Sequence, residues 1–331
     1  MDNKNISMVD IARMAGVSIA TVSRVLNKNG RYSAETEKKV LQVVEKYNYA
    51  INPNAQGLRT NRTKTIGIII PDITNEYFSH IVRSVESSVI PLGYNVFVCD
   101  SNENVDYEAF HIASLQSKGV EGIIYISART SVDEVSTEFT VPVVYIDRRP
   151  GVEFNYVSSD NEMGGFLATQ ELIKKGCHKI AIIHDVNSYS TVNKRIQGYL
   201  NALKKYGAEI DDSRIVPCRV SYEDARRAVK KLISDGVEFD GVFCTTDTMA
   251  LGALRGLKES GKKVPKDVKL VGFDGITHTE ISDPPITTIV QDTAQLGKRS
   301  VEVLMDLINN NASKIHEYTI PVTLSVRGST D

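Results

Sequence analysis

The stretch VDIARMAGVSIATVSRVLN, residues 9–27, decides how the first part of this chain folds. Ser7 and Asp10 have the spacing of a capping box, so a helix is predicted over residues 7–15. Apolar side chains recur at helical spacing inside it, and we expect one face to carry Met8, Val9 and Ala12. The chain therefore opens with a short amphipathic helix.

The residues that follow predict a tight turn and a second helix. Gly16 can adopt the positive φ of such a turn, and Ser18 can cap a helix that begins near Ile19. The apolar face of this helix is predicted to hold Val22, Val25 and Leu26. The side chains left free to contact another molecule are Ile19, Ala20, Thr21, Ser23 and Arg24.

A third helix is predicted from Ser33 onward, because SAETEKKVLQVVEKYNY places acidic residues in the first turn and apolar ones at helical spacing. The apolar residues are Val40, Val43, Val44 and Tyr47. Two helices joined by a glycine turn are typical of modules that lay the second helix in the major groove of DNA. A helical module that binds another protein is the alternative.

Charge is divided unevenly along the chain. Residues 1–64 carry eleven basic and five acidic side chains, a net charge of +6, whereas the remainder carries 28 basic and 36 acidic ones, a net charge of −8. A basic head on an acidic body favours a polyanionic partner for the head. Because a solvated charged surface would give the same imbalance, charge alone does not decide between the two interpretations.

The segment after the predicted helices, NPNAQGLRT at residues 52–60, can form one or two helical turns. Alone it should be unstable, because helices under about 12 residues are marginal in water and Gly57 weakens this one further. We therefore expect it to fold only against a partner. A flexible linker with Leu58 packed on the rest of the protein is the alternative.

From residue 65 the chain alternates apolar β-rich runs with helical patterns, which is typical of parallel βαβ units. Strands are predicted at residues 65–71, 94–100, 122–127, 142–147, 179–184, 240–246 and 268–274. TIGIIIP resembles KIAIIH, GVEGIIYIS resembles FDGVFCTT and PVVYID resembles VKLVGFD, in the same order. The sequence therefore predicts two similar doubly wound lobes, with a ligand cleft at the carboxyl ends of their strands.

These segments together make a family resemblance specific. VDIARMAGVSIATVSRVLN, YNYAINPNAQGL, PDITNEYF, VSSDN, RIQGY, DTMALGALRGL, VGFDG and PPITTI resemble the LacI/GalR (lactose-repressor) family of bacterial transcription regulators. The resemblance covers nearly the whole chain. It implies an all-α helix-turn-helix headpiece (1–50), a hinge (51–64) and an α/β core like that of periplasmic binding proteins (65–331). Lobe 1 would hold about 65–161 and 293–322, and lobe 2 about 162–292 and 323–331.

The resemblance also implies the residues that contact DNA. Base edges would be faced by Ile19, Ala20 and Arg24, and phosphates would be held by Ser7 and Thr21. Leu58 would wedge into a central base step in the minor groove. The full expected set is Ser7, Ser18, Ile19, Ala20, Thr21, Ser23, Arg24, Asn27, Asn54, Ala55 and Leu58.

A small-molecule effector is expected in the cleft, where the resemblance implies that Arg195 and Asp274 grip ligand hydroxyls from opposite walls. The expected set is Asp72, Tyr77, Phe78, Arg148, Asp160, Arg195, Thr246, Asp274 and Gln291. Tyr77 and Phe78 could equally be core residues. Two residues outside this set have simpler roles: Asp247 is expected to cap the helix DTMALGALRGL, and Arg149 could be a solvent-exposed residue.

The identity of the effector is left open by the sequence. The chain departs from the family's common pattern at Thr246 and at His184-Asp185. Adjacent Arg148 and Arg149 would suit a phosphorylated sugar, because a guanidinium pairs well with phosphate. A plain mono- or disaccharide is our first choice.

Motifs of catalysis are missing from the sequence: it contains no phosphate-binding loop, dinucleotide fingerprint, nucleophile elbow or zinc-protease helix. We therefore expect a repressor of carbohydrate-utilisation genes that uses no metal or cofactor and responds allosterically to a sugar or sugar phosphate. The alternative is a sugar-binding protein or a sugar-converting enzyme that does not bind an operator.

A homodimer on a pseudo-palindromic operator is expected, because each chain supplies one recognition helix. The stripe Phe78, Ile81, Val82, Val85 and Val89 is either its interface or the core of lobe 1. The sequence has no C-terminal leucine heptad, so a tetramer is not supported. No feature supports a protein co-effector. The start lacks a secretion signal and no run of about eighteen apolar residues occurs, so we expect a cytoplasmic protein without a membrane partner.

Overall fold

The computed structural model describes residues 6–26, 28–47, 49, 62–128, 139–151, 153–310 and 315–331. The chain divides into two compact units, Met1–Thr63 and Lys64–Asp331. In its described part, the first unit is built of helices, and the second contains two sheets with helices on both faces.

The first unit contains α1 (Met8–Ala15), α2 (Ile19–Leu26) and α3 (Ala34–Lys46). Ser7 and Asp10 form the predicted capping box: the Ser7 hydroxyl accepts from the Asp10 amide at 3.3 Å, and the Asp10 carboxylate accepts from the Ser7 amide at 3.1 Å. Gly16 takes the predicted positive φ, 68°. The helices enclose one small core made of Ile11, Ala12, Ala15, Val22, Val25 and Val40.

The predicted apolar face of α1 is wrong at Val9, whose side chain is 48% exposed. Ile11 is fully buried in its place. Met8, Ile11 and Ala15 are three and four residues apart, so they lie on one side of the helix, and Val9 lies on another.

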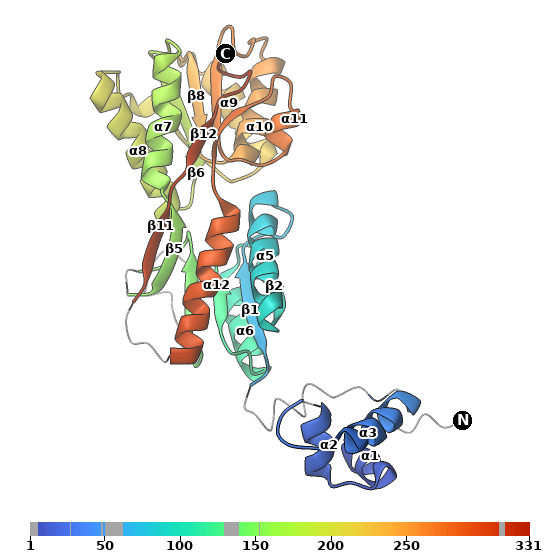
Figure 1. Cartoon of the computed structure of the whole chain (residues 1–331). Coiled ribbons are helices and arrows are strands. Elements are labelled where there is room, and N and C mark those ends of the chain that lie inside the picture. The colour runs from blue at the N-terminus through green and yellow to red at the C-terminus, as the bar shows by residue number, and fades with distance from the viewer. Residues whose placement is uncertain are drawn as a thin grey trace. The chain divides into compact units, whose positions relative to one another are not determined.

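Residues 64–331 form two α/β lobes, each built on a six-stranded sheet (Figure 1). The strand order in lobe 1 is β11-β5-β4-β3-β1-β2, and in lobe 2 it is β12-β10-β9-β8-β6-β7. The strands of lobe 1 are β1 Thr65–Ile70, β2 Asn95–Asp100, β3 Ile123–Tyr125, β4 Val143–Ile146, β5 Asn155–Ser159 and β11 Glu317–Ile320. Those of lobe 2 are β6 Ile180–Asp185, β7 Ile215–Cys218, β8 Gly241–Cys244, β9 Lys269–Asp274, β10 Thr287–Val290 and β12 Thr323–Ser325.

The seven predicted strands are confirmed as β1, β2, β3, β4, β6, β8 and β9. The predicted likeness of the lobes is confirmed too, because β1 and β6, β3 and β8, and β4 and β9 occupy equivalent places in the two strand orders. The sequence did not predict β5, β7, β10, β11 or β12. These strands are three to five residues long and carry polar or prolyl residues, so they lack a continuous apolar run.

Helices cover both faces of each sheet (Figure 1). In lobe 1, α5 (Glu76–Val89) and α12 (Thr293–Asn310) share one core with the sheet, and α6 (Val105–Ser117) packs on the other face. In lobe 2, α9 (Tyr222–Ser234) and α10 (Asp247–Glu259) cover one face, and α7 (Asn161–Lys174) and α8 (Ser190–Tyr206) the other. The short α11 (His278–Ile281) follows β9. Because most strands are parallel, their carboxyl ends meet along one edge of each sheet.

The chain passes between the lobes after β5, after β10 and again between β11 and β12. The apolar stripe on α5 belongs to lobe 1 itself. Phe78 is 6% exposed, and Ile81, Val85 and Val89 are fully buried in the core that α5 shares with the sheet and α12. Of the two roles considered for the stripe, the structure shows the core.

Candidate functional site

The solvent-facing side of α2 carries most of the exposed side chains that the sequence assigned to DNA contact. Ile19 is 47% exposed, and Ala20 and Arg24 are exposed as well. Ser18 caps the helix as predicted, since its hydroxyl accepts from the Thr21 amide at 3.1 Å. Ser7 is exposed within its capping box. This side of α2 presents to solvent an apolar group, Ile19, in its first turn and a basic group, Arg24, in its last turn.

Ser23 differs from the expectation, because it is only 5% exposed. It lies between Val22 and Val25 on the inner side of α2, where little of its side chain can reach another molecule. Asn27 and the three hinge residues expected at DNA, Asn54, Ala55 and Leu58, lie outside the described residues.

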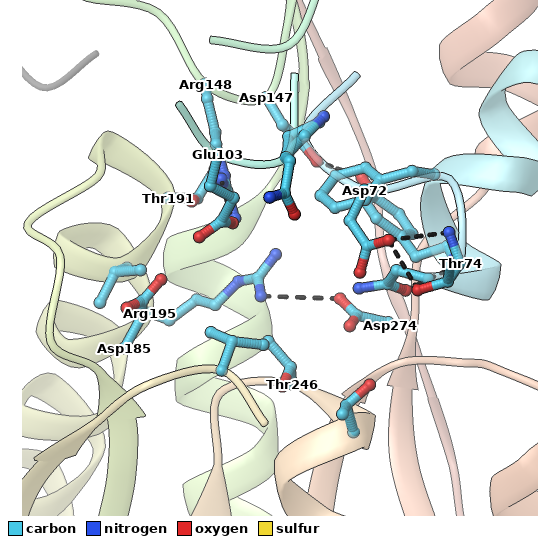
Figure 2. A pocket seen from close by; sticks show the side chains of 18 residues that line it. Asp72, Thr74, Glu103, Asp147, Arg148, Asp185, Thr191, Arg195, Thr246 and Asp274 are labelled. Atoms are coloured by element: carbon cyan, nitrogen blue, oxygen red, sulfur yellow. Dashed lines mark hydrogen bonds and ion pairs between the residues drawn. The ribbon is translucent and has the colours of Figure 1, made fainter. Parts of the chain in front are cut away.

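A cleft of about 360 Å³ lies between the two lobes, where the carboxyl ends of strands from both sheets meet (Figure 2). This volume is in the range of small-molecule sites, about 300–1,000 Å³. Its lining is largely polar and comes from both lobes: Pro71, Asp72, Thr74, Asn75, Tyr77, Phe78, Asn102, Glu103, Asp147, Arg148, Asp185, Thr191, Val192, Arg195, Val220, Thr246, Thr248 and Asp274.

Arg195 of α8 is held in the wall of the cleft by lobe 2. It is 5% exposed, its Nε donates to Asn161 Oδ1 at 2.7 Å, and its Nη1 donates to the Thr245 carbonyl at 2.6 Å. Its guanidinium stacks on Phe273 at 3.7 Å and lies 3.6 Å from Asp274 Oδ1. Among the described residues Nη2 has no hydrogen-bond partner, so this nitrogen of the guanidinium group is available to a ligand.

Two glycines allow α7 and α8 to approach closely enough for this arrangement. A Cβ on Gly165 would lie 2.1 Å from the Arg195 carbonyl oxygen, and one on Gly198 would lie 2.0 Å from that of Glu162. No side chain fits at such distances. The glycine in RIQGY therefore helps to place the arginine of the same motif.

A hydrogen-bonded chain connects the two walls. Gln291 Nε2 donates to Asp274 Oδ1 at 2.8 Å, and Gln291 Oε1 lies 3.2 Å from the Tyr77 hydroxyl. That hydroxyl also donates to the Asp147 carboxylate, whose other oxygen accepts from the Ser159 amide at 2.9 Å. Burial and the adjacent Asp147 raise the pKa of the Tyr77 hydroxyl, which keeps it a donor.

Asp147 and Asp274 are equivalent residues of the two lobes, at the carboxyl ends of β4 and β9. Both have a positive φ, 55° for Asp147 and 123° for Asp274. Such backbone geometry is strained for residues other than glycine and concentrates at binding sites. Burial raises the pKa of the Asp274 carboxyl, and the neighbouring Arg195 opposes that shift.

Several predicted ligand residues lie elsewhere. Asp160 caps α7 by accepting from the Met163 amide at 3.0 Å and borders a separate small hollow. Gln291 is 3% exposed and lies behind the wall. Arg149 is not a solvated residue: its side chain is 10% exposed, lies 2.7 Å from Glu317 Oε1 and stacks on Tyr156. The remaining members of the expected set line the cleft: Asp72, Tyr77, Phe78, Arg148, Arg195, Thr246 and Asp274.

Asp247 does not cap α10 as expected, because Thr246 is the cap and accepts from the Met249 amide at 3.3 Å. Asp247 is fully buried and accepts from the Gly275 and Ile276 amides at 2.7 and 2.9 Å. Burial and the nearby Asp274 raise the pKa of the Asp247 carboxyl. Its role is to fix the backbone that follows Asp274.

The sequence reasoning missed Glu103, Asp147 and Asp185 as lining residues. Asp147 ends the run PVVYID, and Asp185 directly follows KIAIIH. The rule that binding residues follow strands would have found both. Glu103 also follows a strand, but it lies further along the loop after β2, so the rule points to it less directly.

Beside the cleft, Glu76 at the start of α5 connects lobe 1 to lobe 2. Its carboxylate accepts from the Thr277 amide and lies close to His278 Nδ1, both at 2.9 Å, while His80 Nε2 is 3.6 Å away. Burial opposes ionisation, but the contacts with Thr277 and the two histidines lower the pKa of Glu76 to about 2. Glu76 precedes Tyr77 of the cleft, so this contact adjoins the ligand-binding wall.

Comparison with known proteins assigns both units. Residues 7–52 match the model for bacterial regulatory proteins of the lacI family, and residues 63–327 match that for periplasmic binding proteins and the sugar-binding domain of the LacI family. The HTH-type transcriptional repressor PurR of Pasteurella multocida is 34% identical over 309 residues, 92% of each chain. These matches define a DNA-binding transcription regulator with a ligand-binding core.

Solved structures agree with this class. The Lac repressor dimer bound to operator and the anti-inducer ONPF superposes with a TM-score of 0.91 at 27% identity, covering 99% of both chains. A LacI family transcriptional regulator from Enterococcus faecium with bound ribose has a TM-score of 0.71 at 29% identity, over 80% of this chain and 98% of that one.

The chain belongs to the LacI family of bacterial regulatory proteins. It is therefore a DNA-binding transcription regulator and not an enzyme. In the part of the chain that the structure describes, no helix has the length and apolar character needed to cross a membrane.

Proposed function

We propose that this regulator represses carbohydrate-utilisation genes and that a sugar bound in the cleft controls its affinity for operator DNA. The cleft itself carries the proposal. It combines the unpaired Nη2 of Arg195, the carboxylate of Asp274 and the apolar ring of Phe78. The two polar groups suit the hydroxyl groups of a sugar, and the ring suits its C–H face. The ribose-bound family member from Enterococcus faecium supports the same ligand class.

On the DNA side, the proposed contacts are the exposed residues of α2 and its flanks together with the half-buried Thr21. Ile19, Ala20 and Arg24 face base edges in the major groove, and Ser7, Ser18 and Thr21 bind phosphates. Arg24 is the residue best suited to a bidentate contact with guanine, worth about 1–3 kcal/mol of base discrimination. Residues 51–64 act as the hinge between the headpiece and the core.

A homodimer completes the proposal, because one recognition helix per chain reads only half of a two-fold operator. The Lac repressor bound to operator is a dimer, which supports this assembly. Binding of a sugar between the lobes changes their relative position, and the dimer transmits the change to the paired headpieces.

The test is a thermal-shift screen of sugars on the full-length protein, followed by operator-binding titrations with each sugar that raises Tm. We expect at least one sugar to raise Tm and to change the operator affinity in the same concentration range. If no sugar does both, the proposed effector class is wrong. If no duplex is bound in a salt-dependent, sequence-selective way, the assigned DNA contacts are wrong.

A further inference from the structure

The described lining of the cleft carries more negative than positive charge. Two guanidinium groups, Arg148 and Arg195, face five carboxylates: Asp72, Glu103, Asp147, Asp185 and Asp274. With every group ionised the formal charge is −3, and this is the most negative value, because burial raises the pKa of the Asp274 and Asp185 carboxyls. An anionic ligand would enter against this charge, in a narrow space where water screens it poorly.

The charge of each arginine is already offset by a carboxylate of the cleft, and Nη2 of Arg195 is left for a ligand. Arg148 Nη1 lies 3.1 Å from Glu103 Oε1, and its guanidinium stacks on Tyr189 at 4.0 Å. Arg195 lies 3.6 Å from the carboxylate of Asp274. Arg149, the second residue of the pair that seemed suited to a sugar phosphate, is bound to Glu317 and does not line the cleft.

Asp185 independently indicates that this end of the cleft lacks a hydrogen-bond donor. The residue is 3% exposed, and its Oδ1 accepts from the Asn187 amide at 2.9 Å. Its Oδ2 is buried without a hydrogen-bond partner among the described residues. A buried carboxylate oxygen without a donor is costly, so a group that donates hydrogen bonds is favoured beside it.

The partial positive charges at helix amino ends offset part of the negative charge of the cleft. The amino ends of α5, α8 and α10 approach the cleft through Asn75, Thr191 and Thr246, and each contributes about +0.5 of a charge at most. Asn75 and Thr246 already cap their own helices through backbone amides. Together these partial charges offset about half of the surplus and do not reverse it.

We propose that Glu103, Arg148 and Asp185 form a specificity-determining subsite that excludes phosphorylated effectors and accepts hydroxyl donors of an unphosphorylated sugar. The inference rests on the proposed function, since it assigns the effector class of the same cleft. Glu103 occupies the arginine that would otherwise pair with phosphate, and Asp185 adds a carboxylate that repels it.

The experiment compares matched ligand pairs on the full-length protein. D-ribose and D-ribose 5-phosphate, and D-glucose and D-glucose 6-phosphate, are titrated by thermal shift and by calorimetry at neutral pH and two salt concentrations. For any sugar that binds, we expect its phosphate ester to bind at least about tenfold more weakly than the sugar itself. The ratio of the two affinities should become smaller at high salt. Equal or tighter binding of the phosphate overturns the inference and leaves the effector function standing.

Three variants locate the effect. Glu103→Gln frees Arg148, and Asp185→Asn removes one of the five carboxylates, so each should reduce the ratio of sugar affinity to sugar-phosphate affinity several-fold. Glu317→Gln frees Arg149 outside the cleft and should leave the ratio unchanged. Because Glu103 is partly exposed, its variant tests the subsite even if Asp185→Asn does not fold. An unchanged ratio in Glu103→Gln rejects the subsite, whereas the absence of binding by every sugar and phosphate rejects the proposed function instead.

Discussion

In the headpiece, the side chains proposed to meet DNA extend into solvent, and Ile19 is 47% exposed. In the cleft, Arg195 and Asp274 are 5% and 6% exposed and are bound to their neighbours. The headpiece thus offers loosely held groups to a large, highly charged partner. The cleft offers a rigid arrangement to a small one. Substitutions in the two regions should therefore have different effects. In the headpiece a substitution removes a contact with DNA, whereas in the cleft it breaks a buried hydrogen-bond network.

The largest effect is expected from Arg195→Ala in the cleft. The change leaves Asn161 Oδ1 and the Asp274 carboxylate without their arginine, which typically costs about 3–5 kcal/mol for a buried pair. Effector affinity should fall at least about a hundredfold, and operator affinity without effector should persist. Calorimetry with the effector and operator titration measure the two quantities. A variant with normal effector affinity would show that Arg195 has only a structural role.

A smaller effect is expected from Arg24→Ala in the headpiece. Discrimination between the operator and a mismatched duplex should fall by about 1–3 kcal/mol, because a base contact is lost. The free energy of unfolding should change by less than about 0.5 kcal/mol, since the side chain is exposed. Operator titrations at matched salt provide the measurement.

Arg13→Ala is the matched control for Arg24, because Arg13 is an exposed arginine on α1. It should weaken binding to all duplexes alike and leave discrimination unchanged. Equal loss of discrimination in both variants would contradict the assignment of base contact to α2.

The smallest effect is expected from Glu76→Gln, which leaves the cleft and α2 intact. Near pH 5.5 the variant should unfold more easily by about 1 kcal/mol, because it keeps the amide contact with Thr277 but loses the charge near His278. The pKa of Glu76 is lowered to about 2 in the folded protein, so its stabilisation is present above the ordinary value of 4.5 and is lost as pH falls toward 2.

Denaturant unfolding of both proteins at pH 5.5, 4.5 and 3 measures this dependence. The difference in stability should narrow steadily over that series. A difference that is constant with pH would mean that the charge of Glu76 does not contribute. If the contact also couples the lobes, the variant will show a reduced effect of effector on operator affinity at unchanged effector affinity.

Local patterns in the sequence were sufficient for the headpiece and for most of the sheets. The capping box of Ser7 and Asp10 and the turn at Gly16 depend on residues close together in the chain, so their chemistry is visible in the sequence. Val9 was misplaced because one helical turn offers two apolar faces, and only packing against α2 and α3 selects between them. The short strands lacked a run long enough to predict.

The cleft was predictable only as a set of strand ends. The rule that binding residues follow strands placed Arg148, Thr246 and Asp274 correctly in the wall of the cleft. It could not show that Tyr77 meets Gln291, 214 residues away, because that contact depends on the chain crossing between the lobes. Asp160 was misassigned for a related reason: it directly follows β5 at such a crossing, where its side chain caps α7.

The positive φ of Asp147 and Asp274 limits how this regulator can be altered in the laboratory. Asparagine and glycine tolerate the φ of 55° at Asp147, whereas valine, isoleucine and threonine do not, and the φ of 123° at Asp274 is unstrained only for glycine. In a library that randomises both positions, most members would carry about 1–3 kcal/mol of added backbone strain at each position. Retargeting to a new effector is better attempted at Thr246, which lines the same space and has an ordinary extended backbone, with φ −143°.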